Sequence, residues 1–269
     1  MIKPKYSICI THYNYASTLR NSLESILNQI NSDFEVVVVD NMSTDGSEFI
    51  LNEFVNKKEI KLIRAKCSRG RGRQIAFENS SGEYIIANLD MDDIFKPRLG
   101  ELLKRYHDVA DGKLLWAESR MKGKGFWGGE SFTIAPSLLL KDLGGWNDLQ
   151  LFEDLELCSR AARNGKYCRG QFDLLKETNL HSERKRTLIG RMKWKYLRYR
   201  EILRIGLPMQ LWNKRETKKQ KLIKIWMKVC VLPFYGTYKD PFNYEFDCDD
   251  PKYAVTLDAT RQSIEKSVS

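Results

Sequence analysis

The sequence has few features of secreted, membrane-spanning or zinc-structured proteins. No uncharged apolar run reaches the roughly 18 to 20 residues that span a bilayer, and the first residues carry no apolar signal-peptide core. The six cysteines form no CxxC pair and no zinc-like spacing, which favours apolar fillers in a reducing compartment over a disulfide framework. We therefore expect a cytoplasmic protein, either free or peripheral on the inner face of the membrane.

The net charge of +10 is concentrated in one segment. Residues 184–228 contain 16 Lys and Arg against two acidic residues, a net charge of +14, so the rest of the chain sums to about −4. Such segments attract the phosphates of lipid headgroups or nucleic acids. Apolar residues recur there at helical spacing, at Met192, Tyr196, Tyr199 and Leu203 and again at Leu222, Ile225, Trp226 and Val229. These stripes either pack on the rest of the protein or enter a membrane interface.

Apolar runs and helical periodicities alternate through the first 120 residues. Strands are expected at Tyr6–Ile10, Phe34–Val39, Ile60–Ile63 and in the apolar run before Asp90. Apolar residues at helical spacing follow the first strand, and further helices are expected near Glu48–Asn56 and Arg73–Ser80. This order predicts an α/β protein with an open, Rossmann-like, mostly parallel sheet that has helices on both faces.

Polar residues follow each of the four expected strands. Thr11–Asn14 comes after the first strand, Asp40 after the second, a basic glycine-containing loop from Arg64 to Arg73 after the third, and Asp90–Asp93 after the fourth. Ligands of such sheets bind outside the carboxyl ends of the strands. Four polar strand ends in succession therefore predict a shared site at this edge.

The acidic cluster of Asp90, Asp92 and Asp93 is the most informative of these strand ends. Carboxylates this close in sequence repel one another unless a cation lies among them. Oxygen-rich sites suit hard divalent ions such as Mg²⁺ or Mn²⁺, which complete their shell with substrate phosphates. The alternative is a polar strand-to-helix turn in which Asp93 or a neighbour caps a helix with Pro97 in its first turn.

Four segments together resemble family 2 glycosyltransferases with the GT-A fold, over roughly residues 4–182. They are Ser7–Asn14, Val36–Ser47, Gly82–Asp93 and Gly144–Gly165. The resemblance implies an inverting enzyme that transfers a sugar from a nucleotide-diphosphate sugar to a hydroxyl of a glycan or lipid-linked acceptor. It also implies Mn²⁺ or Mg²⁺ as the cofactor.

The resemblance implies roles for single residues. Nucleotide contacts are implied for Thr11, Tyr13, Asp40, Arg73 and Asp90, with Arg69 as an alternative to Arg73. The residues themselves leave another interpretation of Asp40 open, in which it caps the turn before Ser43–Ser47.

The resemblance further implies Asp92 as a metal ligand, with His181 as a second ligand after the last core strand. One departure is Gln74, where the family often has asparagine. Lone His12 receives no role from the sequence.

Glu153 and Asp154 open an expected amphipathic helix. Acidic residues stabilise a helix N-terminus through the macrodipole, so capping is one interpretation. An acceptor hydroxyl, however, must lose a proton as it attacks the sugar, and a carboxylate can accept that proton. The resemblance implies Asp154 as the general base, with Glu153 in a supporting or acceptor-binding role.

We predict a catalytic domain at residues 1–182, a basic helical appendage at 183–246 and a loosely held polar tail at 247–269. Residues 123–130, rich in glycine and aromatic residues, are either a sugar pocket or an ordinary loop.

Two other functions stay open, a nucleotidyltransferase on a similar fold and a nucleic-acid- or membrane-binding protein. Thr11–Asn14 lacks the glycine-rich signature of the first, and the basic segment shows no stacking platform for nucleic acid. We therefore expect an anionic membrane surface, and no nucleic acid, as a partner.

Overall fold

The computed structural model describes residues 3–118, 131–177 and 251–257, together with residues 190, 193, 194, 196, 197, 200 and 201. The first elements in chain order are β1 (Tyr6–His12), α1 (Ala16–Leu27), β2 (Phe34–Asp40), α2 (Ser47–Asn56), β3 (Lys61–Arg64), α3 (Arg69–Glu78), β4 (Tyr84–Ala87) and β5 (Ile94–Phe95). They are followed by α4 (Leu99–Val109), β6 (Leu114–Glu118), β7 (Ser131–Pro136), α5 (Ser137–Asp142), α6 (Glu153–Arg163), β8 (Tyr167–Gln171), β9 (Leu175–Glu177) and the 3₁₀ turn η4 (Pro251–Tyr253).

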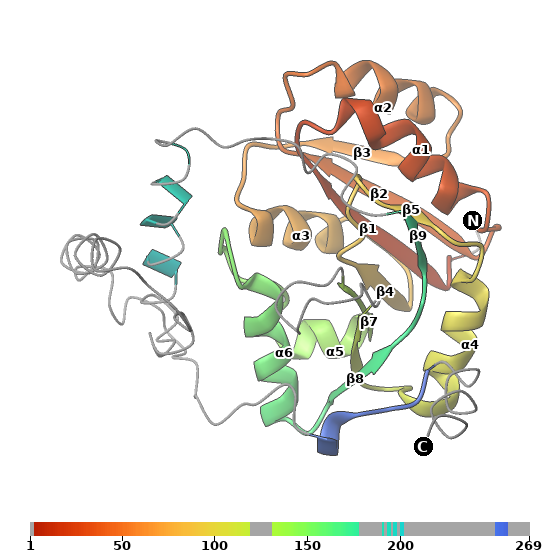
Figure 1. The fold of residues 1–269 in the computed structure, drawn as a ribbon, viewed down its shortest axis with the longest axis vertical. Coiled ribbons are helices and arrows are strands. Elements are labelled where there is room, and N and C mark those ends of the chain that lie inside the picture. Colours follow the sequence, from red (N-terminus) through yellow and green to blue (C-terminus); the bar gives the residue numbers. More distant parts are fainter. Residues whose placement is uncertain are drawn as a thin grey trace.

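Seven of the described strands form one sheet in the order β3-β2-β1-β4-β7-β6-β8 (Figure 1), and β5 pairs with β9 in a separate two-stranded sheet. β1 pairs in parallel with β2 and β4, and β2 pairs in parallel with β3. β7 is antiparallel to both β4 and β6, whereas β8 is parallel to β6. The predicted mostly parallel sheet is confirmed, and β7 is the strand that reverses direction.

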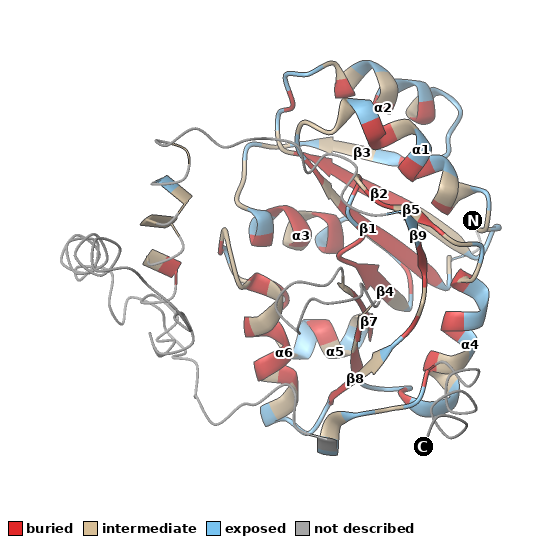
Figure 2. Cartoon of the chain, viewed as in Figure 1, coloured by how far each residue is buried: buried red, intermediate tan, exposed pale blue. Residues whose placement is uncertain are grey.

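Helices cover both faces of the sheet, as predicted. Side chains alternate along a strand, so Val36 and Val38 of β2 face one side while Val37 and Val39 face the other. The first pair belongs to a core with residues of α1, α2 and α4. The second pair belongs to a core with residues of α3, α5 and α6. Figure 2 shows the resulting buried central strands between helices with exposed outer faces.

Helix α3 begins at Arg69, earlier than the predicted Arg73, so part of the expected basic loop is helical. Ser68 caps it, since the Ser68 hydroxyl accepts a hydrogen bond from the Arg71 amide at 3.1 Å. Gly70 and Gly72 are buried in this first turn, and their missing side chains allow close packing rather than loop flexibility. A Cβ at Gly70 would collide with the carbonyl oxygen of Asn147.

The chain after β4 turns sharply at Asn88, which has a left-handed backbone (φ 69°). Asp90–Asp93 forms a turn in which the Asp93 amide donates to the Asp90 carbonyl at 3.3 Å. The short strand β5 comes next, and α4 begins only at Leu99, with Arg98 at its N-cap position. Asp93 therefore does not cap this helix, and the capping alternative for the acidic cluster is wrong.

Residues 251–257, assigned to a loosely held tail from sequence, pack on β8. The Val255 amide donates to the Arg169 carbonyl at 2.8 Å, and Leu257 is buried against Gly170, where a side chain would block it. Tyr253, Val255 and Leu257 make the apolar contacts of this short segment, which is too short to show a periodic pattern in the sequence. Both predicted domain boundaries, at 182/183 and 246/247, lie outside the described residues.

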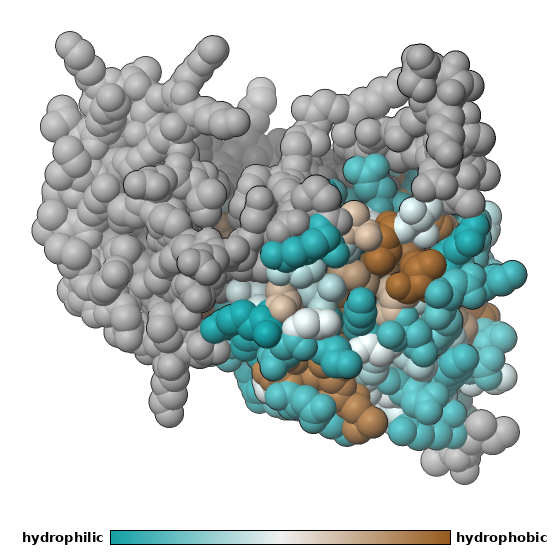
Figure 3. Space-filling view, turned by 90° about the horizontal axis from the view of Figure 1, so that it is seen from below, coloured by the Kyte–Doolittle hydropathy of each residue, from teal (hydrophilic) through white to brown (hydrophobic). Residues whose placement is uncertain are grey.

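No helix in the described part of the chain combines the length and apolar character needed to cross a bilayer. Most of the basic segment 184–232 lies outside the described residues, so its two apolar stripes stay predictions. On the face shown in Figure 3, hydrophilic residues cover most of the described surface and hydrophobic ones form small separate groups. Cys9, Cys158 and Cys168 are buried free thiols, in line with the predicted role of apolar fillers.

Candidate active site

A pocket of about 170 Å³ opens at the carboxyl ends of β1 and β2, beside the start of α3. Its lining residues come from the ends of β1, β2, β3 and β4 and from the segment before α6. They are Thr11, His12, Tyr13, Tyr15, Val39, Asn41, Cys67, Ser68, Arg69, Gly72, Asp90 and Gln150. The predicted shared site at this sheet edge is therefore a real cavity.

Three of the predicted nucleotide residues, Thr11, Tyr13 and Asp90, line this pocket, whereas Asp40 and Arg73 do not. Tyr13 is 49% exposed, so its ring is available to a ligand at the mouth. Arg69, the sequence-based alternative to Arg73, lines the pocket in its place.

Asp40 is fully buried at the end of β2. Its carboxylate accepts hydrogen bonds from the Ser43 amide and from the Ser43 hydroxyl (2.5 Å), and it ion-pairs with Arg64 at 3.2 Å. These contacts match the turn-capping interpretation of Asp40. The nucleotide contact implied for Asp40 stays a prediction.

His12 is a pocket residue that sequence reasoning left without a role. It is 1% exposed, and neither ring nitrogen has a hydrogen-bond partner among the described residues. Burial lowers the pKa of His12, although Asp40 and Asp45 partly oppose this, so its ring is neutral at pH 7. The sequence feature that could have indicated a pocket position for His12 was its place between Thr11 and Tyr13 at a strand end.

The acidic cluster brings three carboxylates close enough together to share a cation. One carboxylate oxygen from each of Asp90, Asp92 and Asp93 lies within 4.8 Å of the other two. Asp90 is exposed on the pocket wall, whereas Asp93 is buried at 3% exposure. All three donors are hard oxygen ligands, so the set fits Mg²⁺ or Mn²⁺.

Helix α6 begins at Glu153, as predicted, and places Glu153 and Asp154 in its first turn. The Arg73 side chain is only 6% exposed and ion-pairs with both carboxylates, at 2.5 Å in the case of Asp154. The amino end of α6 therefore lies against α3 (Figure 1). Residues 80 positions apart in sequence form this contact, which the sequence did not indicate.

Burial raises the pKa of Glu153 to about 7, and the neighbouring Asp154 acts in the same direction. Arg73 and Arg69 oppose the rise without cancelling it. The Glu153 side chain is 2% exposed, so desolvation of its charged form is the dominant cause. Glu153 and Asp154 therefore differ in environment, because Asp154 is 16% exposed.

Arg69 connects the pocket to these carboxylates. It lines the pocket with Asp90, and its Nε lies 3.8 Å from a Glu153 oxygen. Partial desolvation lowers its pKa, but the fields of Glu153, Asp90 and Asp154 more than offset this and raise it. The Arg69 side chain remains 52% exposed and is accessible to an anionic ligand.

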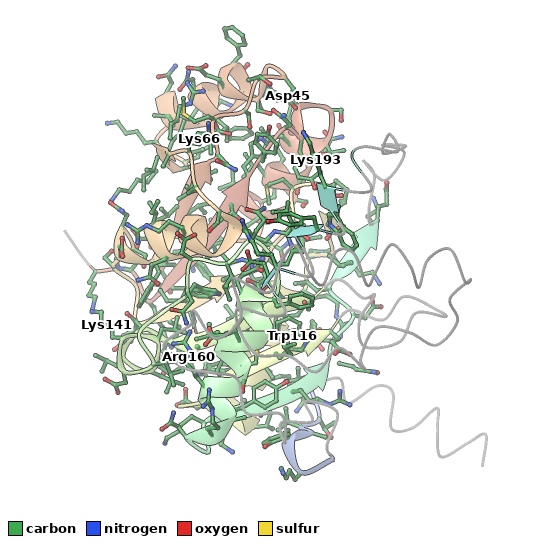
Figure 4. All side chains as sticks on the ribbon, turned by 90° about the vertical axis from the view of Figure 1, so that its left-hand side faces the viewer. Asp45, Lys66, Trp116, Lys141, Arg160 and Lys193 are labelled. Atoms are coloured by element: carbon green, nitrogen blue, oxygen red, sulfur yellow. The ribbon has the colours of Figure 1, made fainter. Side chains whose placement is uncertain are left out.

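The segment before α6 is fastened to its neighbours by side chains of α3 and α6. Gln74 accepts a hydrogen bond from the Trp146 amide at 2.8 Å, which gives this departure from the family pattern a defined contact. Arg160, labelled in Figure 4, donates to the carbonyls of Leu143 and Gly145. The Gly70 amide donates to the Leu149 carbonyl at 2.8 Å.

Two predicted site elements lie outside the described residues. These are His181, implied as a metal ligand, and the glycine- and aromatic-rich residues 123–130. Both stay predictions.

The sequence profile of Glycosyl transferase family 2 matches residues 7–156, more than half of the chain. An uncharacterized glycosyltransferase of Nostoc sp. is 35% identical over 96 residues, which are 35% of this chain and 30% of the relative. An uncharacterized glycosyltransferase of Methanocaldococcus jannaschii is 37% identical over 123 residues, 44% of this chain and 42% of the relative. Each match thus spans less than half the length of the relative.

Two solved structures are similar in fold. TarS residues 1–349 of S. aureus, in complex with UDP-GlcNAc, has a TM-score of 0.52 and 20% identity, with 86% of this chain and 71% of that chain covered. The mannosyltransferase PcManGT of Pyrobaculum calidifontis, in complex with GDP-Man and Mn²⁺, has a TM-score of 0.54 and 17% identity, with 87% and 73% covered. These likenesses confirm the predicted GT-A fold. The profile match and the order of the motifs on this fold lead to one conclusion: the chain belongs to glycosyl transferase family 2.

Proposed function

We propose that this protein is an inverting glycosyltransferase that moves a sugar from a nucleotide-diphosphate sugar to an acceptor hydroxyl. The position of Arg69 is the observation that carries the proposal. Its side chain borders the pocket together with Asp90 and also lies beside Glu153. A donor whose diphosphate meets Arg69 would have its base in the pocket and its sugar directed toward the α6 carboxylates.

The donor would bind mainly through the pocket. Tyr13 and Thr11 would contact the nucleotide, and Asp90 would face the ribose. Arg69 would meet the diphosphate, because a guanidinium is suited to phosphate oxygens and this one is half exposed. Bound UDP-GlcNAc and GDP-Man in the two similar structures support this class of donor without selecting between the nucleotides.

Asp90, Asp92 and Asp93 would hold a divalent cation, with Asp92 as the principal ligand and His181 as a further candidate. When bound, Mg²⁺ or Mn²⁺ would supply Lewis-acid stabilisation of the charge that develops on the leaving diphosphate. The oxygen geometry of the cluster and the Mn²⁺ in one similar structure support this assignment.

Asp154 would be the general base. As the acceptor oxygen forms its bond to the anomeric carbon, the bond from that carbon to the diphosphate oxygen breaks, and the hydroxyl proton passes to Asp154. One such displacement inverts the anomeric configuration. Arg73 would hold Asp154 and Glu153 in place, a role its ion pairs support better than the nucleotide contact first implied for it. Glu153 would support Asp154 or contact the acceptor.

We further propose a glycan or lipid-linked acceptor, with the basic segment 184–228 as an appendage that binds an anionic membrane surface. This proposal keeps the predicted division of the chain into a catalytic domain (1–182), a basic helical appendage (183–246) and a polar tail (247–269). Family membership favours glycosyl transfer over the nucleotidyltransferase alternative.

The test is incubation with a panel of UDP- and GDP-sugars, with release of the nucleoside diphosphate and the product followed by chromatography. Asp154→Asn should lose at least about a hundredfold in kcat, since general-base catalysis contributes about 10² to 10⁴. Asp142→Asn changes an exposed aspartate at the end of α5 and serves as the matched control. Normal kcat in Asp154→Asn, together with loss in Glu153→Gln, would mean that Glu153 is the base.

A further inference from the structure

Trp146 is a buried tryptophan whose indole faces the proposed base. Its side chain is 3% exposed, and its Nε1–H donates a hydrogen bond to Oδ1 of Asp154 at 3.1 Å. The other oxygen, Oδ2, accepts from Arg73 at 2.5 Å. Among the described residues, each oxygen of the Asp154 carboxylate thus has one donor, and the two donors come from different segments of the chain.

The ring and the backbone of Trp146, and the residue before it, are each held by contacts. Its backbone amide donates to Gln74, and its ring packs edge-on against Phe77 with ring centroids 6.1 Å apart. Gly145, the preceding residue, has a left-handed backbone (φ 68°), and the Gln74 amide lies where a Cβ would be. The Gly145 carbonyl accepts from Arg160 at 2.6 Å. These contacts leave the indole little freedom, so its N–H points in a fixed direction.

We propose that Trp146 is a positioning residue for the transfer reaction, which fixes the plane of the Asp154 carboxylate and leaves a lone pair free for the acceptor hydroxyl. The inference rests on the proposed function, because it takes Asp154 as the base. Two donors on opposite oxygens define the orientation of a carboxylate, whereas one donor leaves it free to rotate. Positioning of a reacting group within a fraction of an ångström changes rates strongly.

The chemistry of the indole suits this role. An indole N–H donates only, so Trp146 cannot compete with Asp154 for the proton of the acceptor. The charged groups around Asp154 are Arg73 and Arg69 from α3 and Glu153 from its own helix. A phenylalanine would fill much of the same space without donating.

The kinetic test compares Trp146→Phe with Tyr84→Phe. The control removes a hydrogen bond of equal length, 3.1 Å, from Tyr84 to the Asp111 carboxylate at the opposite end of the sheet. Trp146→Phe should lower kcat at least about tenfold, since the lost hydrogen bond is made to a charged group, while the KM for the donor stays the same. Tyr84→Phe should change none of these quantities.

A spectroscopic test separates this inference from the proposed function. The indole N–H signal of Trp146, assigned by its absence in Trp146→Phe, should shift in Asp154→Asn and not in Asp111→Asn. An unmoved signal in Asp154→Asn, or a normal kcat in Trp146→Phe, would overturn the inference. A shifted signal in an Asp154→Asn enzyme of normal activity would instead overturn the proposed base, and the positioning role with it.

Discussion

Replacement of Glu153 by glutamine should stabilise the protein at alkaline pH, although Glu153 lies in an ion-pair cluster. Glu153 is 2% exposed and ion-paired with Arg73, and burial raises its pKa from 4.5 to about 7. Glutamine has nearly the same shape and can still accept a hydrogen bond from Arg73. The substitution therefore removes the buried negative charge and keeps the packing.

The sign follows from proton binding in the two states. Between pH 4.5 and about 7 the folded protein holds a proton on Glu153 that the unfolded chain has released, so the free energy of unfolding falls as pH rises. At 1.36 kcal/mol per pH unit, this interval corresponds to about 3 kcal/mol. The loss is complete above about pH 8 and absent below about pH 4. Glu153→Gln should show none of this loss.

The assay is urea unfolding of wild type and Glu153→Gln from pH 4 to pH 9. Groups that titrate in both proteins contribute equally to the two free energies of unfolding, so their contributions cancel in the difference. The free energy of unfolding of Glu153→Gln should exceed that of the wild type by an amount that grows with pH, up to about 3 kcal/mol.

Glu35→Gln is the matched control, because the pKa of Glu35 is lowered where that of Glu153 is raised, so the expected effect on stability has the opposite sign. Burial alone would raise the pKa of Glu35, but hydrogen bonds donated by Ser7, Ser81 and Gly82 lower it overall. Its contribution to stability is present at neutral pH and is lost as pH falls through the lowered pKa. Glu35→Gln should therefore destabilise at pH 7 and less so in acid. A pH-independent difference between wild type and Glu153→Gln, or a variant less stable at pH 8, would refute the reasoning for Glu153.

Three further predictions concern the metal, the packing of α3 and the basic segment. EDTA should abolish transfer and Mn²⁺ or Mg²⁺ should restore it, while Asp92→Asn should be inactive with unchanged circular dichroism; full activity in EDTA would contradict the cation site. Gly70→Ala should lower the free energy of unfolding by about 1 to 3 kcal/mol, because its Cβ would overpack against Asn147, and it should also lower kcat. The control Gly100→Ala has open space around the new Cβ and should leave thermal stability unchanged or raise it. Anionic vesicles should sediment the protein at low salt and release part of it at high salt, and equal, negligible binding to anionic and neutral vesicles would argue against a membrane role.

The sheet was predictable because its strands are distinctive in sequence. The run Val36–Val39 is β-branched and buried on both faces, which predicts a central parallel strand. The polar residues after these strands were placed correctly for the same reason, since topology brings their carboxyl ends together. Helix α3 was predicted too late, because glycines and arginines resemble a loop when their packing partners are unknown.

The contacts within the site were less predictable. Arg73 resembles a phosphate ligand in isolation, and only its position on α3 turns it toward Glu153 and Asp154. Trp146 and Gln74 act through partners 8 and 72 positions away, and no local pattern encodes either pairing. The hydrogen bond from Ser43 to Asp40 was predictable as a local alternative, because the two residues lie three positions apart in a turn.

The hydrogen bond from the Gly70 amide to the Leu149 carbonyl has a consequence for motion. It joins the helix behind the pocket to the segment that leads into the proposed base, and Gly70 is buried. A buried, bonded amide exchanges with solvent only when the local structure opens. The rate of deuterium uptake at the Gly70 amide would therefore report how often α3 separates from the segment before α6, in the free protein and without any substrate.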